Sequence, residues 1–180
     1  MKTEVVVFGG GCFWCTEAVF TMLSGVTVVE PGYAGGTKET ATYEDVSSGT
    51  TAHVEVIRIE YDPSLIAFKN LLTVFFASHD ATQVGGQGND AGPQYRSVVF
   101  TTTRAQAEET HAFIDELDAS SRSGDPITTT IEPLVEFFPA ENYHKEYYAR
   151  NQNRGYCKVI IAPKLQKVQK EFADLLKQRP

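Results

Sequence analysis

The sequence is short of basic residues, of cysteines and of long apolar runs, and each shortage excludes a class of protein. Lys and Arg number 16 against 23 Asp and Glu. The resulting net charge of −7 argues against nucleic acid or an anionic membrane as the main partner. No apolar run approaches the roughly 20 residues of a bilayer-spanning helix, and the first residues lack the apolar region and cleavage site of a secretory signal. We expect a cytoplasmic protein.

Three cysteines, Cys12, Cys15 and Cys157, are too few for a secreted domain held together by disulfides, which usually carries an even number. An odd count in a reducing compartment favours thiols that react. For Cys157, a small buried hydrophobe is an equally good interpretation. The Cys12 and Cys15 pair has the stronger claim to chemistry.

The chain has 180 residues, of which 42% are hydrophobic and 22% charged, as in average soluble globular proteins. This length supports one core of good size and hardly two. No internal repeat, low-complexity segment or linker interrupts it. We expect a single domain over residues 1–180, and a monomer.

The order of the apolar patterns predicts an α+β fold. Short β-branched runs predict strands over residues 4–8, 26–29, 53–61 and 96–102, the second of them closed by Pro31-Gly32. Helical patterns follow the first strand and cover 65–77, and a capping box formed by Thr103 and Gln106 begins a further helix that runs to about 119. The order β-α-β-β-α-β predicts a two-layer, ferredoxin-like (split β-α-β) sandwich, an antiparallel sheet with helices on one face. An extended C-terminal segment follows, with a stretch over 127–138 and a last helix that begins at Pro163.

The most informative residues are Gly11-Cys12-Phe13-Trp14-Cys15. Three glycines lead from the first strand into a helix that starts near Cys12, so free backbone N–H groups and the positive helix end point at its sulfur. We expect this position to acidify the thiol and make it a nucleophile. Cys15 lies three residues further on the same helical face and could form a disulfide with Cys12.

Phe13 and Trp14, the latter the only tryptophan, suggest an apolar pocket for a small group beside the reactive cysteine, although aromatic residues on helices more often belong to the core. Glu55 stands between Val54 and Val56, where loss of water would raise the carboxyl pKa toward a range that suits a proton donor. The other interpretation of Glu55 is an edge strand whose polar face meets water. The sequence leaves both pairs of alternatives open.

Five motifs together resemble the A-type methionine sulfoxide reductase (MsrA) family, in the order and at the spacings of that family, over roughly residues 5 to 165. They are Gly11-Cys12-Phe13-Trp14, Gly32-Tyr33-Ala34-Gly35-Gly36, His53-Val54-Glu55, the pair Gln87-Gly88-Asn89-Asp90 and Gln94-Tyr95-Arg96-Ser97, and Ala140-Glu141-Asn142-Tyr143-His144.

The resemblance assigns catalytic roles to residues that are individually weak signals. Cys12 matches the nucleophile of the family, and Glu55 matches the acid that protonates the sulfoxide oxygen. Hydroxyl groups that match Tyr43 and Tyr95 assist the acid. Cys157, in Gly155-Tyr156-Cys157, matches a resolving cysteine near the C-terminus.

It also assigns substrate-binding roles and external partners. Phe13 and Trp14 match the aromatic walls that hold the methyl group, and Asp80 matches an acidic residue of the same pocket. The substrate is then the S epimer of methionine sulfoxide, free or in oxidised proteins. The implied cycle uses a sulfenic acid, an intramolecular disulfide and thioredoxin as the external dithiol, with no bound cofactor and no metal.

Three positions depart from the common pattern. Cys15 replaces a frequent glycine, which leaves the identity of the resolving thiol between Cys157 and Cys15. Because a local disulfide would strain the first helical turn, we favour Cys157 and treat Cys15 as a secondary thiol. Ala52 and Ala81 replace a glycine and a proline without removing a catalytic group.

Two other function classes compete with this interpretation. A Cys-x-x-Cys that opens a helix after a strand is typical of thioredoxin-like oxidoreductases. Alternatively, Cys12, Cys15, His144 and Cys157 could hold a zinc ion. Against these, no thioredoxin-like fold needs the Glu55 and Tyr95 motifs, and the 13-residue gap between His144 and Cys157 is unusual for zinc.

Overall fold

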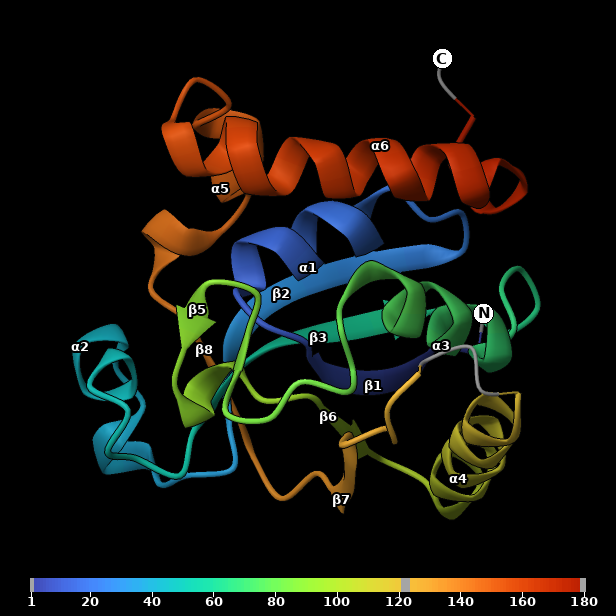
Figure 1. The fold of residues 1–180 in the computed structure, drawn as a ribbon, viewed down its shortest axis with the longest axis horizontal. Helices are drawn as coiled ribbons and strands as arrows, with labels where there is room; N and C mark the ends of the chain where they lie inside the picture. Colours follow the sequence, from blue (N-terminus) through green and yellow to red (C-terminus); the bar gives the residue numbers. More distant parts are fainter. Residues whose placement is uncertain (1, 121–123, 179–180) are drawn as a thin grey trace.

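The computed structural model describes residues 2–120 and 124–178, and a curled six-stranded sheet forms its centre (Figure 1). The strand order is β7-β6-β1-β3-β2-β8. These strands are β1 (Glu4–Gly9), β2 (Val26–Ala34), β3 (Val54–Tyr61), β6 (Val98–Thr101), β7 (Thr130–Pro133) and β8 (Phe137–Pro139). A separate two-stranded ribbon consists of β4 (Gly86–Gln87) and β5 (Asp90–Ala91).

The helices lie mainly on one side of this sheet, and Figure 1 shows α6 running along α1. The α-helices are α1 (Phe13–Thr21), α2 (Tyr43–Ser47), α3 (Phe68–Ser78), α4 (Arg104–Ala119), α5 (Tyr147–Arg150) and α6 (Ala162–Glu171). Short 3₁₀ turns cover Lys38–Thr40, Pro93–Tyr95, Asn142–His144 and Ala173–Leu175, and a π-helical turn covers Cys157–Ile161.

The predicted α+β class is confirmed, and the predicted order of elements reappears as β1-α1-β2-β3-α3-β6. The four strands β6, β1, β3 and β2 are neighbours in that order and run antiparallel. The expectation of a purely antiparallel sheet is wrong, because β7 pairs with β6 in parallel. The predicted stretch over 127–138 contains two strands, β7 and β8, at opposite edges of the sheet.

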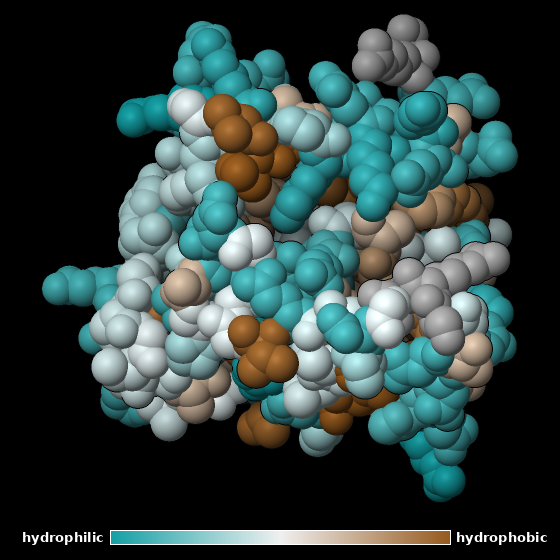
Figure 2. All heavy atoms as spheres, viewed as in Figure 1, coloured by the Kyte–Doolittle hydropathy of each residue, from teal (hydrophilic) through white to brown (hydrophobic). Residues whose placement is uncertain are grey.

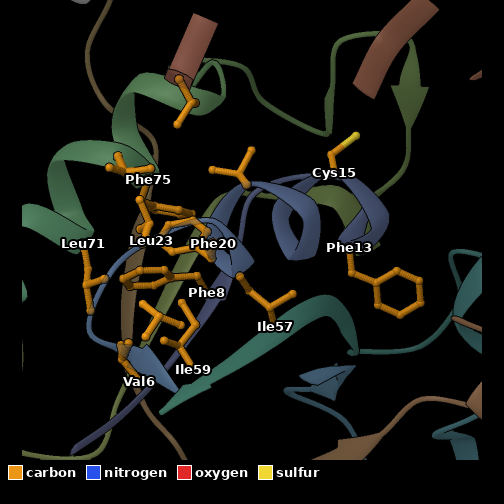
Figure 3. Packing of buried hydrophobic residues seen from close by; sticks show 14 of the residues in the cluster. Val6, Phe8, Phe13, Cys15, Phe20, Leu23, Ile57, Ile59, Leu71 and Phe75 are labelled. Atoms are coloured by element: carbon orange, nitrogen blue, oxygen red, sulfur yellow. The ribbon is translucent and has the colours of Figure 1, made fainter. Parts of the chain in front are cut away.

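Both faces of the sheet are buried, which explains why β1 reads as an almost continuous apolar run. On one face, Phe8 and Ile57 contact the cluster beneath α1 and α3 (Figure 3). On the other face, Val7 and Val56 contact a smaller cluster that Leu134 and Phe137 cover. The view in Figure 2 is mostly hydrophilic, with its brown apolar side chains in separate patches.

The second strand is longer than its sequence indicated, since β2 continues through Pro31 and Gly32 to Ala34. Pro31 lacks an N–H, but its carbonyl accepts a hydrogen bond from the Ala140 N–H at 2.9 Å. Gly32 pairs with Pro139 of β8. A Cβ at Gly32 would collide with the Phe137 ring and the Phe138 carbonyl oxygen, so glycine here permits close approach of β8 rather than ending the strand.

Half of the predicted capping box is present at the start of α4, because the Gln106 side chain bonds back to Thr102, the residue before the N-cap, rather than to Thr103. The Thr103 hydroxyl accepts a hydrogen bond from the Gln106 N–H at 3.2 Å, and the Gln106 side chain accepts one from the Thr102 N–H at 2.9 Å. At the C-terminal end, Pro163 lies in the first turn of α6 as predicted. In the described part of the chain no helix is long and apolar enough to cross a membrane.

We expect Gly32→Ala to lower the free energy of unfolding by about 1–3 kcal/mol, the usual cost of overpacking, because its methyl group meets the Phe137 ring and the Phe138 backbone. Gly155→Ala is the matched control, since nothing lies within 4 Å of its added Cβ. Urea denaturation of both variants and the parent measures the difference. Equal free energies for the two variants would show that β8 does not pack tightly on Gly32.

Candidate active site

Cys12 is the N-cap residue of α1, directly after the glycine turn that leaves β1. Gly11 has a φ of 93°, a left-handed conformation that favours glycine, and a Cβ there would press on the Gln87 side chain at 2.7 Å. The Cys12 carbonyl accepts hydrogen bonds from the N–H groups of Cys15 at 3.1 Å and Thr16 at 3.4 Å. The predicted position of Cys12 at a helix start is therefore confirmed.

Glu55 connects β3 to the same helix end. Its Oε2 accepts a hydrogen bond from the Phe13 N–H at 3.1 Å, one of the donors that a helix start leaves without an internal partner. The side chain belongs to the α1-facing side of β3, together with Ile57, and is only 2% exposed. Burial raises the pKa of Glu55 to about 8, although the Phe13 N–H lowers it. The expected desolvation is confirmed, and Glu55 is mainly protonated at neutral pH.

The two neighbouring thiols titrate in opposite directions. Burial raises the pKa of Cys12 well above its usual value, and a hydrogen bond with Cys15 and the charge of Glu55 raise it further. The same hydrogen bond is the largest cause that lowers the pKa of Cys15 to about 7. The prediction that the helix start acidifies Cys12 is wrong, because the loss of water raises the pKa of this thiol more than the helix N–H groups lower it. Cys15 is the first of the pair to ionise.

Tyr43 and Tyr95 join Cys12 and Glu55 from two separate segments. Tyr43 is the first residue of α2, and Tyr95 ends the 3₁₀ turn Pro93–Tyr95. Burial raises the pKa of both phenols, and the charges of Glu55 and Cys12 raise it further. Both phenols remain protonated at neutral pH and are hydrogen-bond donors.

The structure does not bring Asp80 to this group. Asp80 is exposed, and its Oδ1 accepts hydrogen bonds from the N–H and the hydroxyl of Thr82, at 3.0 and 2.6 Å. The acidic residue near the thiols is Asp90 of β5, whose Oδ2 accepts a 2.7 Å hydrogen bond from the Tyr156 hydroxyl. Its charge also raises the pKa of Glu55 and Cys15. Asp90 was present in a motif, but no local signal distinguished it from Asp80.

Trp14 lies in an aromatic group that the sequence did not assign. Its ring stacks on Tyr147, with centroids 3.7 Å apart and planes 6° apart, and Tyr156 meets it edge-on at 6.1 Å. The indole N–H donates a 2.9 Å hydrogen bond to Nδ1 of His144. These contacts fix the orientation of the half-buried Trp14 ring.

Phe13 is fully buried and belongs to the main core cluster. Figure 3 shows its ring pointing away from Phe8 and Phe20. Its ring lies 4.9 Å from the His144 ring and 5.8 Å from that of Tyr33. Phe13 and Trp14 therefore meet at His144, at the Cys12 end of α1.

Cys157 lies in the π-helical turn Cys157–Ile161 and is fully buried. Burial raises its pKa, and the charge of Cys15 adds to this effect. The preceding Tyr156 places its hydroxyl 3.8 Å from the Cys15 sulfur. All three cysteines are free thiols.

The zinc alternative does not fit these positions. Within residues 2–120 and 124–178, no three His, Cys, Asp or Glu side chains gather as metal ligands. The Nδ1 atom of His144 is already the acceptor for the Trp14 indole.

Known proteins resemble this chain over almost its whole length. The family model described as peptide methionine sulfoxide reductase matches residues 4–176. The peptide methionine sulfoxide reductase MsrA of Chromobacterium violaceum is 47% identical over 173 residues, which are 96% of this chain and 98% of the relative.

Solved structures agree with the sequence comparison. Reduced Mxr1 from Saccharomyces cerevisiae superposes with a TM-score of 0.79 at 31% identity, over 87% of this chain and 90% of that chain. Mxr1 in complex with Trx2 superposes with a TM-score of 0.55 at 25% identity, over 81% and 85% of the two chains. The family model and the Chromobacterium relative favour a methionine sulfoxide reductase over the thioredoxin-like alternative. This chain belongs to the MsrA family of peptide methionine sulfoxide reductases.

Proposed function

We propose that the chain reduces the S epimer of methionine sulfoxide, free and in oxidised proteins, with Cys12 as the nucleophile. The observation that carries this proposal is the buried Glu55 carboxyl, which the Phe13 N–H holds at the helix end where Cys12 lies. A buried acid with a pKa of about 8 beside a thiol suits the transfer of a proton to a developing oxyanion.

The substrate methyl group contacts Phe13 and Trp14. Both rings are held by His144, Phe13 through ring contact and Trp14 through its indole N–H. A preorganised apolar wall recognises the methyl group and sets the sulfoxide sulfur toward Cys12.

The chemical step moves one oxygen atom. The Cys15 thiolate accepts the proton of Cys12 through their hydrogen bond, and the Cys12 thiolate attacks the sulfoxide sulfur. As the S–O bond weakens, Glu55 gives its proton to the oxygen while Tyr43 and Tyr95 donate hydrogen bonds. The attack forms a bond between the Cys12 sulfur and the substrate sulfur. The protonated oxygen leaves the substrate as hydroxide and bonds to the Cys12 sulfur, which breaks the S–S bond. Methionine leaves with that electron pair, reduced by two electrons, and Cys12 is oxidised by two electrons to a sulfenic acid.

Resolution of the sulfenic acid uses the neighbouring thiols. The sequence favoured Cys157 as the resolving thiol, but the side chain that shares a hydrogen bond with Cys12 is Cys15. Cys12 is the N-cap residue and lies before Phe13, the first residue of α1. The Cys15 sulfur attacks the Cys12 sulfur, and the proton that Cys15 took from Cys12 moves to the leaving hydroxide, which gives water and a Cys12–Cys15 disulfide. The Cys157 thiolate then attacks the Cys15 sulfur, forms a Cys15–Cys157 disulfide and releases the Cys12 thiolate.

An external dithiol of the thioredoxin type completes the cycle by exchange with the last disulfide, and no bound cofactor is needed. The relative Mxr1, which has been solved in complex with Trx2, supports this reductant. In this proposal the acidic residue of the substrate pocket is Asp90, which accepts a hydrogen bond from Tyr156, rather than the predicted Asp80.

With dithiothreitol as reductant, we expect stereospecific reduction of the S epimer and no turnover of the R epimer, measured by chromatography of methionine. Cys12→Ser should abolish turnover with free and peptide-bound substrate, because the attacking atom is lost. Thr16→Ser, which keeps the hydroxyl that donates to the Phe13 carbonyl, is the control for general damage to the helix start and should keep the turnover of the parent. Substantial activity of Cys12→Ser would exclude Cys12 as the nucleophile.

The rate should fall as the pH rises through about 8, because only protonated Glu55 can donate. Glu55→Gln should lower the rate about 10²–10⁴-fold, as for loss of a placed general acid, and should remove this decline. Stopped-flow formation of methionine from pH 6 to 10 measures both effects. Glu60→Gln on the same strand, whose carboxylate pairs with Arg58, is the control and should keep the profile of the parent. A Glu55→Gln rate within twofold of the parent would count against the role.

A single turnover without reductant, followed by rapid acid quenching and tryptic mapping, identifies the disulfides. We expect a Cys12–Cys15 linkage at early times, replaced by Cys15–Cys157. In Cys157→Ser the first linkage should accumulate. A direct Cys12–Cys157 linkage in the parent, with Cys15 free to alkylate, would exclude the relay through Cys15.

A further inference from the structure

Glu17 is a buried carboxylate that the reaction does not use. It lies on α1, one turn beyond Phe13, and is 4% exposed. Its Oε1 accepts a 2.8 Å hydrogen bond from the backbone N–H of Glu146. A buried charged group needs hydrogen-bond partners, and the partner of Glu17 lies 129 residues away in the sequence.

Glu146 is an unusual residue to find at the other end of this bond. Its φ of 52° makes it the one residue other than glycine in the left-handed region of the described chain. A side chain at such a position is strained, and surrounding contacts must hold it there. The Glu17 carboxylate is one of those contacts, since it binds the N–H of the strained residue itself.

The strained residue directs the next side chain onto Trp14. Tyr147 begins α5, a single helical turn, and its ring stacks on the Trp14 indole at 3.7 Å. A cavity of about 450 Å³ lies between α1, α5 and α6, and Glu17, Tyr148 and Leu165 are among the residues that line it.

We infer that Glu17 is a positioning residue, which holds the Glu146 turn so that Tyr147 fixes the Trp14 ring that receives the substrate methyl group. The inference rests on the proposed role of Trp14 in substrate binding. Glu17 itself touches neither the substrate nor the thiols, so its influence is on binding rather than on the chemical step.

The same contact gives the site a dependence on pH. Burial raises the pKa of Glu17 to about 6, the N–H groups of Glu146 and Tyr147 lower it, the Glu146 carboxylate raises it, and Arg150 lowers it. Above this pKa the ionised carboxylate binds the N–H groups strongly, and below it the neutral acid binds them weakly. A raised pKa also means that ionisation of Glu17 opposes folding, so its stabilising contribution is complete below pH about 4.5 and is lost as the pH rises through about 6.

Trp14 is the only tryptophan, so its fluorescence reports the stack directly. We expect Glu17→Ala to increase acrylamide quenching of Trp14 and to raise KM for a sulfoxide peptide about tenfold, with kcat within twofold. Glu17→Gln keeps an acceptor oxygen and should restore most of both properties at pH 8. Gln169→Ala is the matched control and should behave as the parent. Gln169 lines the same cavity, but its side chain donates a hydrogen bond to the Met22 sulfur rather than to the Glu146 turn.

The pH titration separates this role from a merely structural one. The parent should show a change in Trp14 fluorescence with a midpoint near pH 6, and Glu17→Gln should show none between pH 5 and 7. A titration that persists in Glu17→Gln belongs to another group, such as His144, and overturns the inference. So do parent-like quenching and KM in Glu17→Ala. If Glu17→Ala fails to fold, the comparison of the parent with Glu17→Gln decides. Because quenching needs no turnover, it tests this inference even if the proposed reaction fails.

Discussion

The hydrogen bond from the Phe13 N–H to Glu55 is the contact on which the site depends. It joins β3 to the first turn of α1 and places a carboxyl group beside Cys12, although Glu55 lies 42 residues from Phe13 in the sequence. Because the carboxyl is buried, it is mostly protonated at neutral pH, and a neutral Glu55 does not repel a thiolate. A proton donor and an anionic nucleophile can therefore coexist in one desolvated site.

Loss of water opposes a negative charge on both Cys12 and Glu55. The pKa of Cys12 is raised by burial, whereas Cys15 ionises near pH 7 because Cys12 supplies a hydrogen bond to it. The ionisation of each of these three groups therefore depends on the other two, so the apparent pKa values belong to the group rather than to any one residue. The helix start contributes N–H donors, but it does not compensate for desolvation on its own.

Local signals were enough for the order of the elements, the helix start at Cys12 and the capped start of α4, because each depends on residues close in sequence. Pro31-Gly32 was read as a turn because the partner that explains Gly32, β8, lies about a hundred residues later. Asp80 and Asp90 both lie in the segment between α3 and β6, and only the hydrogen bond from Tyr156 to Asp90 distinguishes them. The direction of the Cys12 pKa could not be predicted, since it depends on how completely distant segments exclude water.

The C-terminal third of the chain serves the site in two ways that are physically coupled. It supplies the aromatic contacts of Trp14, through His144 and Tyr147, and it also supplies the buried thiol Cys157. Tyr156 connects the two functions, since its ring meets Trp14 edge-on while its hydroxyl lies 3.8 Å from the Cys15 sulfur. Any disulfide formed by Cys15 changes the atom against which Tyr156 rests, and so disturbs an edge of the Trp14 pocket. If Trp14 holds the substrate methyl group as proposed, oxidation of the thiols and release of the reduced product are linked through one side chain, because Tyr156 contacts both the Trp14 ring and the Cys15 sulfur.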